Sequence, residues 1–519
     1  MFRLRTLLVL FACLNFGIAN AQQVRLDAVE GSASISGELL EFDGTTFKVN
    51  TPVGVFSINA ATVICTGAGC PKLDELPSEF TIAGPSQTIG QLMADILTNY
   101  GEDSDGEVFQ SISSDQVSEF SIVDFDGQEQ AQIQLIARSS TQAIADLLEG
   151  RASIAVSDRR VTPEEEALFQ QSGKGAFSAS NNEQGLALDG LVAMVADSNP
   201  VRVISQNTLA RVFAGEITNW SQLGGPDLPV ELFLPDPGTA SSQAFRTLIM
   251  SPNEKAVSPS AQMVDASEFV ADYVQSNPNA IGIGKFSALR NAKALSIEGV
   301  CGLPIDASIF TIQSGEYPLV QPVYLYFSRQ TVPLHGRKLL EYAQEDFVQS
   351  MVLDAGLVDK RVSAKSIGVH GQHLISAITD VSNPDTLVAV QRMFGNLSEA
   401  DRLSTVFWFD TESDQLSPES EAKIALLVKF LNSIDTSTTE IQILGFTDRL
   451  EDSTERADLS RFRAEAIRDG LVQQGREASW LPNIRTYGYA SIAPLGCNDD
   501  VAGRSLNRRV EIWLRHARF

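Results

Sequence analysis

The sequence predicts an α/β protein of several domains: a small N-terminal β module, a large domain of alternating strands and helices, and a C-terminal βαβαβ domain. The chain of 519 residues is longer than one hydrophobic core usually supports. Residues 78–360 repeat a strand, a hydroxyl-rich turn and an amphipathic helix, a pattern typical of parallel sheets. Residues 401–519 alternate strands with two helices. We therefore expect domains at 22–76, 78–360 and 401–519, with 361–400 as a connector.

The charge of the chain excludes one class of partner. The sequence holds 65 Asp and Glu against 39 Lys and Arg, a net charge of −26. Such a charge repels nucleic-acid phosphates and anionic lipid headgroups. Nucleic acid is therefore not expected as a partner.

Residues 1–21 are expected to be a secretory signal peptide. Arg3 and Arg5 precede an apolar run, and residues 19–21 (Ala-Asn-Ala) offer a cleavage site between small residues. The alternative is a lipoprotein cleavage box with lipidation at Cys13, although the apolar run continues past that residue to a better site. No later segment offers about 18 uninterrupted apolar residues, so we expect an exported chain without a membrane-spanning helix.

Residues 22–76 are predicted to form a small β module that serves as an adaptor or interaction module. The Asp43-Gly44 pair lies between two short apolar runs and is a strong hairpin signal. Export favours disulfides, and Cys65 and Cys70 are the predicted pair because they are close in sequence. The pairing of Cys301 and Cys497 is left open.

Three strand-to-helix turns in residues 78–360 share one design. Each follows an apolar strand, carries hydroxyl side chains and precedes a helical pattern; they are residues 85–88, 138–141 and 238–242. In open sheets the loops at the carboxyl ends of strands face the ligand crevice. Helix N-termini with Ser and Thr there would form a cradle for an oxyanion. The alternative is that these residues only cap their helices.

Several motifs in this region resemble the periplasmic phosphate-binding proteins of PstS type. They are GRASIAVSDR (150–159), VFAGEITNW (212–220), LGG (223–225), NPNAIG (277–282) and YPL (317–319), the last followed by YLY (324–326). The order and spacing of the motifs make the resemblance specific, although each motif alone is weak. The resemblance implies a two-lobed periplasmic binding protein of type II that closes over a small anion.

Carried over residue by residue, the resemblance places phosphate ligands at Ser86, Thr88, Ser139, Ser140, Thr141, Asp158, Thr239, Ala240 and Ser241. Asp158 would discriminate between anions, since a buried carboxylate accepts a hydrogen bond from protonated phosphate but repels fully ionised sulfate. The alternative is that Asp158 forms a surface ion pair with Arg159 or Arg160.

The sequence departs from this family in one important place. Where the family has an arginine a few residues before a Ser-Gly-Thr turn, this chain reads Leu-Pro-Asp-Pro (234–237), and its turn is Thr-Ala-Ser (239–241). A bidentate guanidinium is the usual strong ligand of phosphate. Arg138, in the second turn, is the candidate replacement.

The C-terminal domain carries a second set of motifs. Strands are predicted near 406–409, 441–444, 484–489 and 510–514, with helices starting at Pro418 and Ser460. The motifs GFTD (445–448), LSRFRA (459–464) and NRRV (507–510) resemble the C-terminal, peptidoglycan-binding domain of OmpA. Phe446 and Arg456 stand where that family usually has histidine and asparagine.

This second resemblance implies that Asp448 and Arg463 bind the diaminopimelate of the peptidoglycan stem. Diaminopimelate presents an ammonium and a carboxylate, so one anionic and one fork-shaped cationic partner suit it together. For Arg508 a structural and a ligand-facing role are equally open.

The combination predicts a non-enzymatic, cell-wall-anchored solute-binding protein of the periplasm that captures phosphate or a similar oxyanion. No cofactor or metal is expected. An ABC transporter is a candidate partner, and the outer membrane a candidate location. The alternative is a structural or sensory envelope protein whose PstS-like domain binds another ligand or protein. An enzyme is disfavoured, because none of the four histidines lies in a motif with a nucleophile and an orienting acid.

Overall fold

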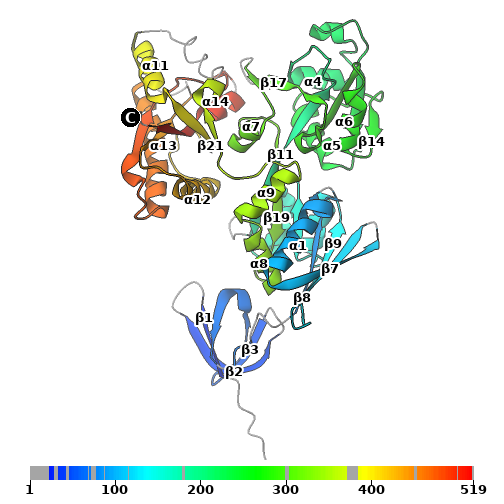
Figure 1. Cartoon of the computed structure of the whole chain (residues 1–519), viewed down its shortest axis with the longest axis vertical. Helices are drawn as coiled ribbons and strands as arrows, with labels where there is room; N and C mark the ends of the chain where they lie inside the picture. The colour runs from blue at the N-terminus through cyan, green and yellow to red at the C-terminus, as the bar shows by residue number, and fades with distance from the viewer. Residues whose placement is uncertain are drawn as a thin grey trace, which may run out of the picture.

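The computed structural model describes residues 23–28, 33–42, 46–67, 69–71, 77–86, 88–114, 116–177, 182–298, 303–370, 384–448, 453–499 and 501–516. The expected signal peptide, Cys13 and Cys301 lie outside these residues. Figure 1 shows the β module below a two-lobed α/β domain, with the C-terminal domain beside the second lobe.

The N-terminal β module is one five-stranded sheet of order β4-β3-β2-β1-β5. Its elements are β1 (Gln23–Ala28), β2 (Ser34–Phe42), β3 (Thr46–Thr51), β4 (Gly54–Asn59), η1 (Ala60–Thr62) and β5 (Val63–Thr66). Strands β2 and β3 pair antiparallel, which confirms the predicted hairpin, although residues 43–45 of its turn lie outside the described residues. Cys65 and Cys70 form the predicted disulfide.

The first lobe of the large domain is built on the sheet order β19-β10-β6-β9-β8-β7. Its strands are β6 (Ser78–Gly84), β7 (Gly106–Ser114), β8 (Val117–Asp124), β9 (Glu129–Ala137), β10 (Ile154–Ser157) and β19 (Val320–Phe327). Its helices are η3 (Thr88–Met93), α1 (Ala94–Asp103), α2 (Ser140–Leu148), α3 (Pro163–Gln171), α8 (Leu334–Tyr342) and α9 (Asp346–Asp354). Strand β6 is parallel to both β9 and β10, as the alternating pattern predicts.

The second lobe continues the same sheet in the order β14-β13-β15-β11. Its strands are β11 (Glu183–Val195), β13 (Glu231–Pro235), β14 (Gln262–Val264), β15 (Ala280–Lys285) and β16 (Lys293–Ala294), and β12 (Val203–Ser205), β17 (Ser296–Glu298) and β18 (Pro304–Ile305) form a small separate sheet. Its helices are α4 (Gln206–Phe213), η4 (Trp220–Leu223), α5 (Ala240–Phe245), η5 (Arg246–Met250), α6 (Ser267–Gln275), η6 (Phe286–Ala288) and α7 (Ile309–Ser314). Strand β13 is parallel to both of its neighbours, β14 and β15.

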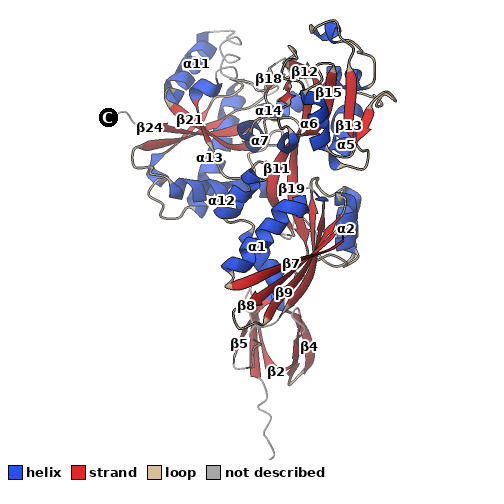
Figure 2. Ribbon diagram, turned by 45° about the vertical axis from the view of Figure 1, so that its right-hand side comes forward, coloured by secondary structure: helices blue, strands red, loops and turns tan. Residues whose placement is uncertain are grey.

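The two lobes are joined by strands that belong to both. The first half of β11 pairs with β19, as far as Gly190, and the second half pairs with β15 from Leu191 onward. Figure 2 shows β11 and β19 running between the lobes. Each lobe has its own hydrophobic core, so the lobes are separate units on a shared pair of strands.

The C-terminal domain has a five-stranded sheet of order β20-β21-β24-β22-β23. Its elements are β20 (Ala364–Ser366), η7 (Ile367–His370), α11 (Pro384–Leu397), β21 (Ala400–Trp408), α12 (Pro418–Ser433), β22 (Thr439–Gly445), α13 (Ser453–Gln474), η8 (Leu481–Asn483), β23 (Ile484–Gly488), α14 (Val501–Asn507) and β24 (Arg509–His516). Figure 2 shows α12 and α13 together on one side of this sheet.

Two features of this domain differ from the expectation. Helix α13 begins at Ser453, seven residues before the predicted start at Ser460, so most of the stretch between Asp448 and Arg463 is helical instead of a polar loop. The predicted connector is part of the domain, because it supplies strand β20, which pairs with β21, and helix α11.

Cys497, whose pairing was left open, is disulfide-bonded. No helix in the described part of the chain is both long and apolar enough to cross a membrane.

Candidate functional site

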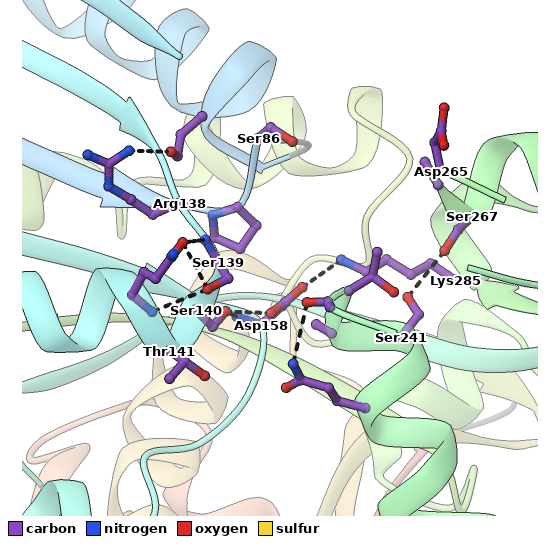
Figure 3. A pocket seen from close by; sticks show the side chains of 18 of the residues that line it. Ser86, Arg138, Ser139, Ser140, Thr141, Asp158, Ser241, Asp265, Ser267 and Lys285 are labelled. Atoms are coloured by element: carbon purple, nitrogen blue, oxygen red, sulfur yellow. Dashed lines mark hydrogen bonds and ion pairs between the residues drawn. The ribbon is translucent and has the colours of Figure 1, made fainter. Parts of the chain in front are cut away.

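A cleft of about 540 Å³ opens between the two lobes of the large domain. The predicted phosphate ligands line it, with one exception: they are Ser86, Arg138, Ser139, Ser140, Thr141, Asp158, Thr239, Ala240 and Ser241. Thr88 is the exception, because it is buried in the first turn of η3, and its amide donates to the carbonyl of Pro85 at 2.9 Å. Figure 3 shows that these side chains approach the cleft from both lobes.

The wall from the first lobe is the N-terminus of α2. Ser139 caps this helix, with its hydroxyl accepting from the amide of Gln142 at 3.3 Å. Ser140 and Thr141 form the first turn, where backbone N–H groups have no acceptor within the helix and the helix dipole is positive. The turn therefore caps the helix and also lines the cleft.

Asp158 lies at the base of the cleft, directly after the fully buried strand β10. It is 3% exposed, and its carboxylate accepts from the hydroxyl of Ser140 at 2.6 Å. The alternative of a surface ion pair is wrong, because Arg159 pairs with Glu165 at 2.7 Å and Arg160 with Glu419 at 3.3 Å. Asp158 is thus a buried acceptor that faces the cleft.

Lys285 is the partner of Asp158, and it comes from the opposite lobe. Its Nζ lies 2.9 Å from Oδ2 of Asp158. Burial alone would raise the pKa of Asp158, but the Lys285 ammonium and the Ser140 hydroxyl outweigh it and hold the pKa below its usual range. Burial would likewise lower the pKa of Lys285, but the carboxylates of Asp158 and Asp189 raise it. Both groups are therefore charged at neutral pH.

The wall from the second lobe combines two helix starts. Thr239 caps α5, accepting from the amide of Ser242 at 3.3 Å, and Ser241 lies in the first turn of that helix. The hydroxyl of Ser241 is 3.2 Å from that of Ser267, the first residue of α6. The cleft is therefore lined by hydroxyl groups and backbone amides from both lobes.

Arg138 lines the cleft but is engaged elsewhere. Its Nε lies 3.4 Å from Asp146, and its Nη1 donates to the carbonyl of Ala137 at 3.2 Å. The guanidinium is consequently directed along the edge of the cleft, as Figure 3 shows, and the cation at the base of the cleft is Lys285.

The predicted pair of the C-terminal domain is buried. Asp448 is 2% exposed and accepts from Nη1 of Arg508 at 2.9 Å. Arg463 donates to the backbone carbonyls of Ser413 at 2.8 Å and Asp410 at 3.0 Å. Arg508, for which two roles were open, thus pairs with Asp448. Residues 449–452, directly after Asp448, lie outside the described residues.

Comparison with known families agrees with these two regions. Residues 101–346 match the family model described as a PBP superfamily domain, and residues 408–508 match the OmpA family. The chain joins a PstS-like binding-protein domain to an OmpA-family domain.

Relatives match each domain separately. Phosphate-binding protein PstS of Bacillus subtilis is 29% identical over 232 residues, which are 44% of this chain and 71% of that protein. Outer membrane porin F of Pseudomonas aeruginosa is 30% identical over 116 residues, which are 22% of this chain and 32% of the porin. A solved ABC-type phosphate transport receptor from Vibrio cholerae is 20% identical with a TM-score of 0.41, covering 54% of this chain and 99% of that one.

Sequence reasoning missed the contribution of the second lobe beyond Thr239–Ser241. Ala266, Ser267 and Lys285 of this lobe also line the cleft of the PstS-like domain, and so does Gln116 of the first lobe. One signal for Lys285 was present in the sequence, because a lysine ends the otherwise apolar strand Ala280–Lys285 at its carboxyl end.

Proposed function

We propose that the PstS-like domain captures a small protonated oxyanion, phosphate, in the cleft between its lobes. The observation that carries the proposal is the cleft itself, in which a buried carboxylate lies among hydroxyl groups and helix N-termini of both lobes. Donors from two lobes suit a tetrahedral anion, because its oxygens point in divergent directions.

Asp158 would set the choice of anion. An ionised carboxylate only accepts hydrogen bonds, so a bound anion has to donate one to it. Phosphate keeps a proton at neutral pH, whereas sulfate does not and would meet a buried like charge. The charged state of Asp158 beside Lys285 supports this role.

Titration calorimetry on the full chain at neutral pH tests phosphate capture. We expect phosphate to bind at micromolar concentration or tighter, and sulfate to give no resolved heat. Asp158→Asn should bind phosphate more weakly and discriminate less against sulfate. Equal binding of both anions by the unaltered protein would contradict the proposal.

We further propose that the OmpA-family domain holds the chain on peptidoglycan through Asp448 and Arg463. The matching motifs around both residues and the family match over residues 408–508 support it. The chain would then be an exported, periplasmic binding protein retained at the cell wall and not an enzyme. Delivery of phosphate to an ABC transporter and location at the outer membrane are further parts of this proposal.

Co-sedimentation with purified peptidoglycan tests wall binding. Asp448→Asn keeps the shape of the side chain but removes its charge, and it should reduce the sedimented fraction several-fold. Asp458→Asn is a matched control, because Asp458 pairs with Arg461 on the exposed face of α13. Undiminished sedimentation of Asp448→Asn would rule out the role of Asp448.

A further inference from the structure

The ion pair at the base of the cleft connects the two lobes. Asp158 follows β10, a strand of the first lobe, and Lys285 ends β15, a strand of the second. The Lys285 side chain is 9% exposed and that of Asp158 4%, with 2.9 Å between Nζ and Oδ2. Figure 3 shows the lysine reaching across the cleft to the carboxylate.

Lys285 has capacity for a further acceptor. An ammonium carries three N–H donors. Within the described residues, the ammonium donates one side-chain hydrogen bond, to Asp158, while the carboxylate of Asp189 acts on it through charge. A buried cation costs desolvation free energy and is usually matched by more than one polar contact. An anion in the cleft would supply the missing acceptors.

No other cation lies at the same place in the described part of the cleft. Arg138 is the other basic residue of the lining, and its guanidinium is directed to Asp146 and to a backbone carbonyl. The segment before Thr239 reads Leu-Pro-Asp-Pro-Gly (234–238) and holds no basic residue. The positive charge for an anion therefore has to come from the strand end of the second lobe.

We propose that Lys285 is the charge partner of the bound oxyanion and supplies the cation that the turn at Thr239 lacks. This inference rests on the proposed capture of phosphate. The anion enters between the two charged groups, accepts hydrogen bonds from the Lys285 ammonium and donates a hydrogen bond from its P–OH group to Asp158. The direct ion pair between Lys285 and Asp158 is thus exchanged for contacts of both groups with the ligand.

Contact of the anion with both Lys285 and Asp158 would explain how the cleft selects a protonated anion without an arginine. The ammonium and the carboxylate cancel in charge, so a fully ionised anion gains attraction from one and repulsion from the other. A protonated anion turns that repulsion into a hydrogen bond. Because the two groups belong to different lobes, an anion that satisfies both also holds the lobes together.

Calorimetric titration of phosphate into full-chain variants tests the proposal. Lys285→Met removes the ammonium and should weaken phosphate binding about 30-fold or more, as expected for a buried charged hydrogen bond. Lys285→Arg restores a cation and should recover most of the affinity. Lys255→Met is the matched control, since Lys255 pairs with Glu216 on the surface of the same lobe, and it should bind as the unaltered protein does.

The outcomes separate the two proposals. If the unaltered chain binds no phosphate, both the proposed function and this inference fail. If it binds phosphate and Lys285→Met binds equally well, this inference alone is overturned.

A crystal structure of the unaltered chain with phosphate decides the matter if Lys285→Met does not fold. An ammonium within about 3 Å of a phosphate oxygen supports the proposal. Phosphate bound with Lys285 on Asp158 alone overturns it.

Discussion

Asp158 and Glu511 show how a buried carboxylate acquires its role from its neighbours. Each is held ionised by a cation in the interior, Asp158 by Lys285 and Glu511 by Arg402 and Arg509. Asp158 faces a cleft, whereas Glu511 lies in a closed network in the middle of β24. The first carboxylate is therefore available to a ligand, and the second contributes to stability.

The low pKa of the Glu511 carboxyl group leads us to expect that the protein loses stability in acid. Burial alone would raise its pKa, but Arg402 and Arg509 outweigh it and lower the pKa from 4.5 to about 2. A carboxyl group with a depressed pKa stabilises the fold above its unfolded pKa, and this stabilisation, about 3 kcal/mol, is lost as the pH falls from about 4.5 to about 2.

Urea unfolding at a series of pH values measures this loss. Glu511→Gln, which cannot ionise, should show a shallower fall in unfolding free energy over the same pH range. Glu421→Gln, on the exposed face of α12, should follow the unaltered protein. Identical slopes for the Glu511 variant and the unaltered protein would contradict the assignment.

The residues of the site differ in how far the sequence predicts them. Asp158 and the three hydroxyl turns were predicted because they follow apolar strands within recognisable motifs. Lys285 was not predicted, because it lies 127 residues from Asp158 and only the pairing of strands across two lobes brings them together. Thr88 is the predicted ligand that does not line the cleft, and it is buried at the start of η3.

The position of helix α13 depends on two glycines that allow it to pack closely against the sheet. Gly445 ends β22, and a Cβ there would lie 1.7 Å from the carbonyl oxygen of Ser460 on α13. Gly488, at the end of the neighbouring strand β23, would place a Cβ 2.6 Å from the hydroxyl of the same serine. Two glycines thus bring α13 against the sheet and position Arg463 beside β22.

Gly445→Ala should destabilise the OmpA-family domain by roughly 3 kcal/mol, because the clash is with backbone and forces the helix away from the sheet. Gly395→Ala is the matched control. Gly395 is an exposed residue of helix α11, and a Cβ added there would have no neighbouring heavy atom within 4 Å. It should raise stability by about 0.5–1 kcal/mol through helix propensity. Thermal unfolding of both variants measures the difference, and a stable Gly445→Ala would contradict the packing.

The sequence did not indicate that α13 begins before Ser460. Residues 453–458 are polar apart from Ala457, so hydrophobic periodicity does not indicate a helix there. Helix propensity and the contacts of later residues in the same helix extend it through this stretch. The strands β22, β23 and β24 were predicted to within two residues, and β22 and β24 each contain a short apolar run, whereas the polar first half of β21, from Ala400, was missed.

For the whole molecule, the contact between the two domains has a buried ionic centre. Arg402 on β21 pairs with Glu316, which follows α7 of the second lobe, and lies 3.1 Å from Glu511 of its own domain. The contact with the first lobe is exposed: Arg160 pairs with Glu419 at 3.3 Å and Lys429 with Asp346 at 2.9 Å. The buried ion pair between the OmpA-family domain and the large domain therefore lies on the second lobe.

Arg402→Met should cost about 3–5 kcal/mol, because it leaves two buried carboxylates without their shared cation. The thermal midpoint should fall, and proteolysis between the domains should become faster. Glu419→Gln removes one exposed ion pair and should change stability by less than about 1 kcal/mol. Equal effects of the two variants would show that the buried contact does not hold the domains together.

In the proposed function, the cleft of the PstS-like domain selects phosphate over sulfate. Equilibrium dialysis of the full chain against radiolabelled phosphate, with and without a large excess of sulfate, tests it most directly. From the proposal we expect saturable binding of one phosphate per chain that excess sulfate leaves unchanged. Phosphate binding that sulfate displaces in proportion to its concentration, or no binding at all, would contradict it.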